Sequence, residues 1–157
     1  MGAAKARPPF VKHIHAIDVS TKMLELAEVK VKAATVSNLT LACADIEKFS
    51  ENGAKYDVIM GHAILHLLDD KGAVIAMVYN MLKPGGNFVS STVCMGTRWS
   101  PLRVGLILGE NLGQLLTVRY FSIEGIEQSL TDVGFTIDHQ WAPENSDAVF
   151  IVAKKQA

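Results

Sequence analysis

The stretch Leu82–Thr92, which reads LKPGGNFVSST, decides the fold because a helix must stop there and a strand can begin. Proline cannot continue a helix, and adjacent glycines permit a tight turn. Asn87–Val93 then has the composition of a strand. Upstream, the segment Val74–Leu82 repeats apolar residues at helical spacing behind Asp69 and Asp70, which predicts a helix with acidic residues at its positive end.

Strands and helices alternate on the N-terminal side of this turn. Tyr56–Gly61 (YDVIMG) is a continuous apolar run, which predicts a strand buried on both faces. Farther upstream, a predicted strand over Lys12–Val19 leads into a helix capped by Ser20 or Thr21. Leu39–Ala44 is the next predicted strand. This alternation indicates an α/β domain with a mostly parallel sheet.

The C-terminal part of the sequence predicts a helix followed by two consecutive strands. The helix covers Phe121–Val133, with Ser122 as its cap and Gly134 as its stop. The two strands, Phe135–Trp141 and Ala148–Lys154, are joined by a short polar loop. Consecutive strands with such a short connection pair antiparallel, so we expect an antiparallel hairpin at the edge of the sheet.

Length and composition favour a single domain over residues 1–157. The net charge of −1 gives no electrostatic footprint for nucleic acid or an anionic membrane. Cys43 and Cys94 lie in apolar runs, so we expect buried, reduced thiols and a cytoplasmic protein. Residues 95–120 are rich in leucine but interrupted by proline and glycine, and we expect one or two helices there that cover a pocket.

The ordered set of motifs resembles the class I S-adenosylmethionine (SAM)-dependent methyltransferases, in particular small-molecule enzymes of methyltransferase types 11 and 25. HAIDVSTKMLELA resembles the family's second strand and following helix, and ACADI resembles the end of its third strand. YDVIMGHAILHLL resembles the fourth strand and its active-site turn, and LKPGGNFVSST resembles the turn into the fifth strand. The resemblance implies a Rossmann-like sheet, SAM as cofactor and a small-molecule methyl acceptor that the motifs do not identify.

One part of the family pattern is not found in these 157 residues: a first strand that runs into a G-x-G-x-G loop. In the complete fold the strand order is 3-2-1-4-5-7-6. Without strand 1, the neighbouring strands can close directly to give 3-2-4-5-7-6, a second chain can fill the gap, or the chain misfolds unless an N-terminal piece is supplied. We expect direct closure with formation of a homodimer through the exposed sheet edges. Because the glycine loop lets the backbone approach the cofactor closely, we also expect weak or lost SAM binding and impaired activity.

The resemblance assigns cofactor contacts to the first two strand ends. Asp18, followed by Val19, resembles the acid that accepts hydrogen bonds from the ribose hydroxyls; the alternative is a residue that caps the next helix. Met23 resembles the apolar residue beside the adenine, or is a core methionine. Asp45 with Ile46 resembles the contact to the adenine edge, or is an acid that caps the following turn.

The resemblance places Gly61, His62 and Ala63 at the turn after the fourth strand, facing the cofactor or the substrate. His62 is the candidate general base, since histidine titrates near neutral pH; the alternative is a loop histidine without a chemical role. His62 and His66 are four residues apart, a spacing that suits a metal on a helix. No third ligand accompanies them at a suitable spacing, so we expect no metal site.

Three functional classes remain open. The first is a methyltransferase, and the second is a non-catalytic remnant of that fold that acts as a binding or oligomerisation module. The third is a nicotinamide-binding Rossmann protein, because Asp18 would suit a ribose there too. The Lys83–Gly86 turn and the terminal hairpin argue against the third class, and cofactor binding discriminates the first two.

Overall fold

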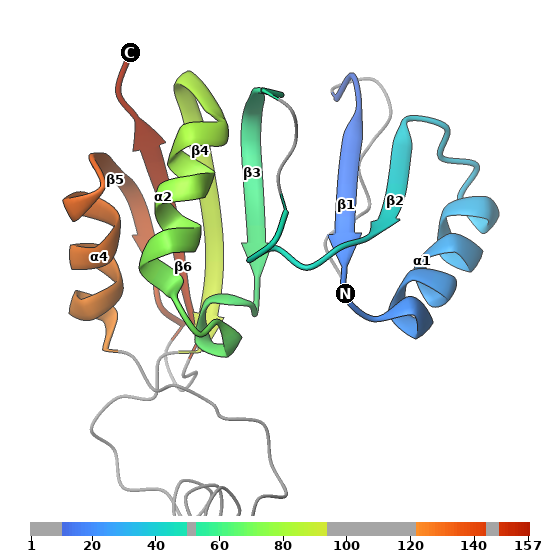
Figure 1. Ribbon diagram of the computed structural model, residues 1–157, viewed down its shortest axis with the longest axis horizontal. Coiled ribbons are helices and arrows are strands. Elements are labelled where there is room, and N and C mark those ends of the chain that lie inside the picture. The colour runs from blue at the N-terminus through green and yellow to red at the C-terminus, as the bar shows by residue number, and fades with distance from the viewer. Residues whose placement is uncertain (1–10, 50–52, 94–121, 144–147) are drawn as a thin grey trace, which may run out of the picture. The chain divides into compact units, whose positions relative to one another are not determined.

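The computed structural model describes residues 11–49, 53–93, 122–143 and 148–157 (Figure 1). The chain divides into two compact units, Met1–Glu51 and Asn52–Ala157, and each is described by itself. The segment expected to cover a pocket, residues 95–120, lies outside the described residues. No described helix is long and apolar enough to cross a membrane.

The first unit is a strand–helix–strand motif made of β1 (Ile14–Asp18), α1 (Thr21–Ala33) and β2 (Leu39–Cys43). The two strands pair in parallel, with Asp18 opposite Cys43 at the carboxyl end. Ser20 caps α1 as predicted, since its Oγ accepts the Met23 N–H at 3.3 Å. No side chain among residues 11–49 is fully buried. This unit therefore depends on local hydrogen bonds more than on a core.

The second unit contains a four-stranded sheet in the order β3-β4-β6-β5. β3 and β4 pair in parallel, and β6 pairs antiparallel with both β4 and β5. The predicted α/β class with an antiparallel C-terminal hairpin is therefore confirmed. The elements in chain order are β3 (Tyr56–His62), η1 (a 3-10 turn, Leu65–Leu67), α2 (Lys71–Met81), β4 (Leu82–Val93), α4 (Ile123–Asp132), β5 (Phe135–Trp141) and β6 (Ala148–Lys155).

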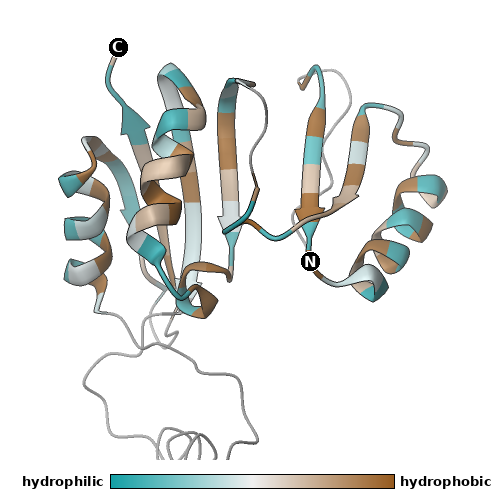
Figure 2. Ribbon diagram, in the orientation of Figure 1, coloured by the Kyte–Doolittle hydropathy of each residue, from teal (hydrophilic) through white to brown (hydrophobic). Residues whose placement is uncertain are grey.

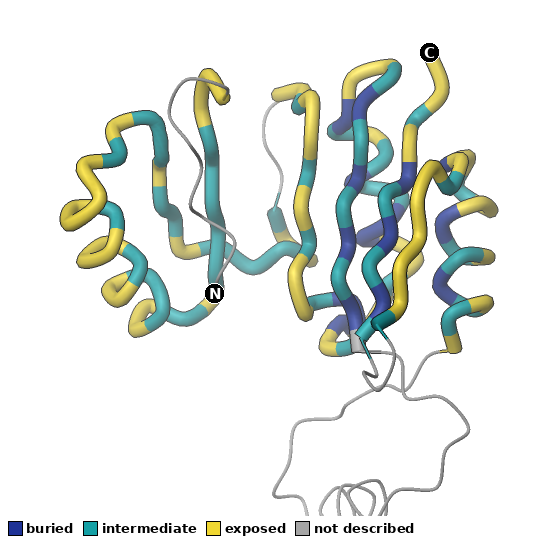
Figure 3. The backbone as a smooth tube through the Cα atoms, turned by 180° about the vertical axis from the view of Figure 1, so that it is seen from behind, coloured by how far each residue is buried: buried dark blue, intermediate teal, exposed yellow. Residues whose placement is uncertain are grey.

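The core of the second unit lies between its sheet and the helices α2 and α4, which cover the same face (Figure 1). The buried segments gather on this unit (Figure 3), and α2 is apolar along most of its length (Figure 2). All thirteen buried apolar residues found in the described chain belong to it. They are Leu65, Leu68, Val74, Ile75, Val78, Leu82, Phe88, Ile126, Leu130, Phe135, Val149, Ile151 and Ala153.

The described strands form two sheets, β1-β2 in the first unit and β3-β4-β6-β5 in the second. Direct closure of β1 onto β3, in the order 3-2-4-5-7-6, stays a prediction. Each strand–helix–strand unit pairs its own two strands, β1 with β2 and β3 with β4, and this local pairing needs only the crossover helix between them. The pairings within the two sheets correspond to the 3-2 and 4-5-7-6 parts of the expected order.

Two predictions of burial are wrong. β3 is not buried on both faces, because Val58 is 48% exposed and Met60 is 53% exposed. These residues alternate with Ile59, whose partner in β4 is the buried Phe88, so one face of β3 meets the core and the other does not. Cys43, the last residue of β2, is an exposed thiol. A burial prediction from apolar sequence alone cannot say whether the second face of a strand is covered.

The predicted turn at Lys83–Gly86 follows the end of α2, as expected, but its residues lie within β4. Gly85 has a positive φ of 76°, which favours glycine. A Cβ added at Gly86 would lie 2.9 Å from the Lys83 carbonyl oxygen and 3.0 Å from that of Asp57, too close for any side chain. The ladder with β3 is irregular here, so β4 begins at Leu82 and contains a bulge where a separate turn was expected.

Candidate functional site

The candidate cofactor residues of the first unit meet at one edge of its sheet. β1 and β2 are parallel, so their carboxyl ends lie together, and Asp18 is opposite Cys43. The Ala44 N–H donates to the Asp18 carbonyl oxygen at 3.2 Å, which ties the segment leading to Asp45 to the end of β1. Two acidic side chains predicted from separate motifs are thus brought to the same edge, where ligands of open α/β sheets bind.

Asp18 caps the turn into α1, as the alternative interpretation predicted, but it uses only one of its two carboxylate oxygens for this. Its Oδ1 accepts the Ser20 N–H at 2.8 Å, which shapes the turn into α1. Within the described residues, Oδ2 has no hydrogen-bond partner. The carboxylate is therefore fixed in orientation and keeps one oxygen for a ligand. Val19, the next residue, is 66% exposed at the start of this turn.

Met23 lies in the first turn of α1, with its backbone N–H bonded to the Ser20 cap. Its side chain is partly exposed, and α1 has no buried residue. The structure therefore does not make Met23 a buried core methionine.

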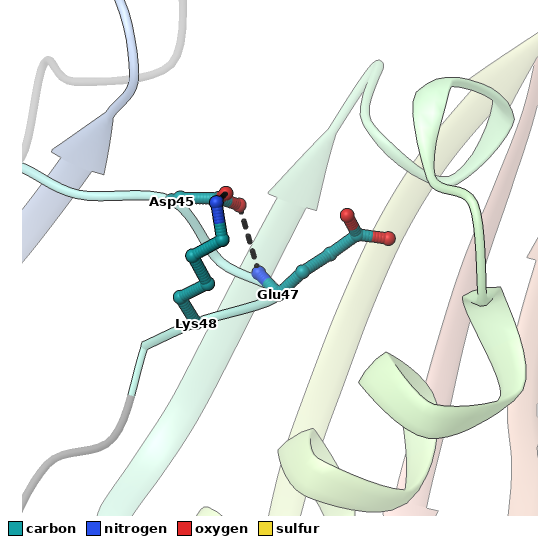
Figure 4. Close-up of polar contacts among 3 residues, drawn as sticks. All are labelled: Asp45, Glu47 and Lys48. Atoms are coloured by element: carbon teal, nitrogen blue, oxygen red, sulfur yellow. Dashed lines mark hydrogen bonds and ion pairs between the residues drawn. The ribbon is translucent and has the colours of Figure 1, made fainter.

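Asp45 forms a compact turn with the two residues that follow Ile46 (Figure 4). Its Oδ1 accepts the Glu47 N–H at 3.0 Å, and its Oδ2 lies 3.3 Å from the Lys48 Nζ. The Glu47 side chain points away from this pair (Figure 4). The Lys48 side chain is 84% exposed, and such surface ion pairs contribute at most about 1 kcal/mol. A ligand amine can therefore replace Lys48 at little cost.

The predicted turn of the second unit is attached to β4 through Ser91. β3 runs through His62, whose Nδ1 lies 3.2 Å from the Ser91 Oγ. The Ala63 N–H donates to the Ser91 carbonyl oxygen at 2.7 Å. Ala63 has φ 51°, in the left-handed region that residues other than glycine rarely adopt. Sequence reasoning missed Ser91, because only the parallel register places it beside His62.

Packing alone accounts for the glycine at position 61. A Cβ added there would lie 3.3 Å from the Ile64 Cγ2 and 3.4 Å from the Phe88 ring. Gly61 therefore lets β3 approach the core closely, and a contact with cofactor is not needed to explain it.

His66 does not form a helical metal pair with His62, because His62 ends β3 and His66 lies in η1. The His66 Nδ1 is buried and has no hydrogen-bond partner in the described chain. Burial lowers the pKa of His66, since the charged ring loses solvation. No group of three potential metal ligands occurs among the residues that the structure describes.

Comparison with known proteins gives a family match over more than half of the chain. The profile of a methyltransferase domain family matches residues 2–86. The chain is 32% identical over 123 residues to malonyl-[acyl-carrier protein] O-methyltransferase of Priestia megaterium, covering 73% of this chain and 42% of that protein. It is 30% identical over 90 residues to arsenite methyltransferase of Rattus norvegicus, covering 52% of this chain and 24% of that protein. The chain thus spans less than half the length of these curated relatives.

Solved structures show the same fold. The N-methyltransferase NodS of Bradyrhizobium japonicum, in complex with S-adenosyl-L-homocysteine (SAH), aligns with a TM-score of 0.70 at 20% identity. The alignment covers 96% of this chain and 70% of NodS.

Proposed function

The chain belongs to the class I SAM-dependent methyltransferases, and we propose that it transfers a methyl group from SAM to a small-molecule acceptor. The observation that carries the proposal is the pair of carboxylates, Asp18 and Asp45, at the carboxyl edge of the first sheet. This is the edge at which the fold binds nucleotides, and both side chains have an oxygen that a ligand can reach.

The first unit offers groups that match the two polar parts of adenosine. The Asp18 Oδ2 can accept a hydrogen bond from a ribose hydroxyl while Oδ1 remains bonded to Ser20. The Asp45 carboxylate can accept the exocyclic amine of adenine in place of Lys48. In the described chain the Ile46 N–H has no acceptor, so it can donate to a ring nitrogen. These residues therefore fit the adenosine half of SAM.

Methyl transfer requires little from this chain beyond the alignment of the acceptor with the methyl group. SAM, when bound, supplies a methyl group already activated by its sulfonium. The protein must hold an acceptor in line with that group and exclude water. We assign His62, at the end of β3, as the residue that takes up a proton from the acceptor.

Calorimetric titration of the chain with SAH tests the proposal. Because the 157 residues contain no G-x-G-x-G loop, we expect binding weaker than micromolar. Asp18→Asn should weaken it further by about tenfold, the effect of losing roughly 1.4 kcal/mol of a charge-assisted hydrogen bond. Asp138→Asn, at an exposed site on β5, is the matched control and should bind like the parent. Micromolar binding would contradict the expected weakness, and equal affinities of parent and Asp18→Asn would contradict the ribose assignment.

A second candidate is a non-catalytic module that binds a partner or a second copy of the chain. It is favoured by four large apolar side chains described in the second unit that are about half exposed: Val58, Met60, Leu67 and Trp141. Light scattering tests this alternative directly. A dimeric mass together with no heat on SAH titration would favour the module, and a monomer that binds SAH would favour the enzyme.

A further inference from the structure

We propose that Ser91 is a positioning residue that holds His62 with its Nε2 directed toward the methyl acceptor as the proton-accepting atom. The inference rests on the proposed function and adds a residue that no motif in the sequence indicates. It concerns only β3 and β4, which belong to the same unit.

The geometry connects Ser91 to two consecutive residues of the candidate turn. His62 and Ser91 are partners in the parallel ladder, so their side chains stand on the same face at the carboxyl end of both strands. The His62 Nδ1 lies 3.2 Å from the Ser91 Oγ, and the Ala63 N–H donates to the Ser91 carbonyl oxygen at 2.7 Å. One residue of β4 thus fixes both the ring of His62 and the backbone that follows it.

The backbone at Ala63 supports a positioning role for this contact. A left-handed backbone conformation costs of order 1 kcal/mol or more at a residue that has a Cβ. Such a conformation persists where the surrounding structure fixes it. Ala63 adopts φ 51° while its N–H is bonded to Ser91. The chain therefore turns away immediately after His62, which leaves this exposed ring at the end of the strand.

The tautomer of the neutral imidazole decides which ring nitrogen can take up a proton from the methyl acceptor. A neutral histidine carries one N–H, and the charged ring carries two. If Nδ1–H donates to the Ser91 Oγ, the lone pair is on Nε2, and proton uptake there leaves the bond to Ser91 intact. In the other tautomer the lone pair faces the serine, and Nε2 cannot take up a proton. Only the first arrangement makes His62 a base toward a ligand.

This arrangement suits an acceptor that loses a proton, such as a hydroxyl or a thiol. The acceptor atom forms a bond to the methyl carbon as the carbon–sulfur bond breaks, and that electron pair stays on sulfur. The acceptor's proton passes to the His62 Nε2 and then to solvent, to which the ring is exposed. A carboxylate acceptor is already deprotonated, so it would not need the His62–Ser91 pair.

The test is a nitrogen-15 NMR spectrum of the ring nitrogens in the histidine-labelled chain, at a pH where imidazole is neutral. We expect His62, assigned by its loss in His62→Gln, to be mainly the Nδ1–H tautomer. Ser91→Ala should reverse the ratio in favour of the Nε2–H tautomer, and Ser91→Thr, which keeps a hydroxyl, should restore the parent ratio. The His13 ring, bonded through Nε2 to Thr40 in the other unit, should be unchanged throughout.

Two results would overturn the proposal: a parent His62 that is mainly the Nε2–H tautomer, or a Ser91→Ala ratio equal to the parent's. If Ser91→Ala does not fold, the parent spectrum decides alone. The spectrum needs neither SAM nor an acceptor. A failure of this inference is therefore distinguishable from a failure of the proposed function, which would be an absence of SAH binding.

Discussion

The two units have similar elements but are stabilised differently. α1 in the first unit has no buried residue and exposes Leu26 and Val29, whereas α2 in the second buries Val74, Ile75 and Val78. Burial of apolar area is the main source of stability, at roughly 25 cal/mol per Å². The candidate adenosine residues therefore lie on the weakly packed unit, and the His62–Ser91 pair lies on the well-packed one.

This difference has a functional meaning. A unit that is held mainly by strand pairing and a helix cap gains stability from any ligand that binds only its folded form. Residues on a packed sheet, in contrast, are held in place before a ligand arrives. We therefore expect the candidate adenosine residues of the first unit to be ordered by binding, and the His62–Ser91 pair of the second unit to be preorganised.

The largest effect should come from truncating a buried leucine of the second unit, with an exposed leucine of the first unit as its control. Leu130 in α4 is 0% exposed, and Leu26 in α1 is 52% exposed. Leu130→Ala should lower the free energy of unfolding by about 2–5 kcal/mol, because it leaves a cavity in the core. Leu26→Ala should change it by no more than about 0.5 kcal/mol. Urea unfolding measures both, and equal losses would contradict the contrast in packing.

The next effect concerns a lysine that caps α2 from β6. The Lys155 Nζ donates to the carbonyl oxygens of Tyr79 at 2.8 Å and Leu82 at 3.0 Å, and it lies 4.4 Å from the Tyr79 ring centroid. Lys155→Met should cost about 1–2 kcal/mol in urea unfolding, because it leaves these carbonyl groups without their charged donor.

Lys83→Met is the matched control, because Lys83 pairs with the exposed Asp57 at 2.8 Å. The hydrogen bond and charge of Lys83 lower the pKa of Asp57, yet exposed pairs contribute little to stability. We expect no measurable change in the free energy of unfolding. A loss as large as that of Lys155→Met would mean that the two lysines are not distinguished by their surroundings.

The helix caps of the two units should have smaller effects on stability. Ser20 caps α1, and Ser122 caps α4 through its contact with the Gly125 N–H at 3.1 Å. Each Ser→Ala change should cost about 1 kcal/mol. Ser122→Ala should shift the global urea midpoint, whereas Ser20→Ala should only speed hydrogen exchange of the α1 amides. Identical global shifts would indicate that the two units unfold together.

The smallest effect is a dependence of stability on pH through His66. Burial lowers its pKa in the folded chain, so the unfolded chain binds this proton more readily. The free energy of unfolding should therefore fall as the pH drops through the ordinary histidine range, and level off below the folded pKa. Urea midpoints at about pH 7.5 and about pH 5.5, on either side of that range, should differ less in His66→Gln than in the parent. An equal pH dependence in both proteins would contradict the role of His66.

The sequence predicted the local elements well because their signals are local. Ser20 and Ser122 cap the helices expected of them, and Gly134, with φ 105°, ends α4. The terminal antiparallel pair followed from a short connection between two apolar runs. Asp18 and Asp45 were predicted to be strand-end acids, and the structure places both at one edge.

What the sequence did not predict depends on contacts between distant segments. Closure of β1 onto β3 stays a prediction, because no local signal specifies which strands pair between the two units. The burial of Val58 and Met60 was wrong, because an apolar run does not reveal what covers its second face. Ser91 was missed because only the pairing of β3 with β4 places it beside His62, from which it is 29 residues away in the sequence.

Hydrogen exchange of the backbone amides, with and without SAH at a concentration that saturates the calorimetric signal, shows whether the first unit binds the adenosine part of the cofactor. We predict that SAH slows exchange in β1, α1 and the Asp45 turn, and changes exchange in α4 and β5 little. Protection confined to the second unit, or no protection anywhere, would contradict the assignment of the adenosine site to Asp18 and Asp45.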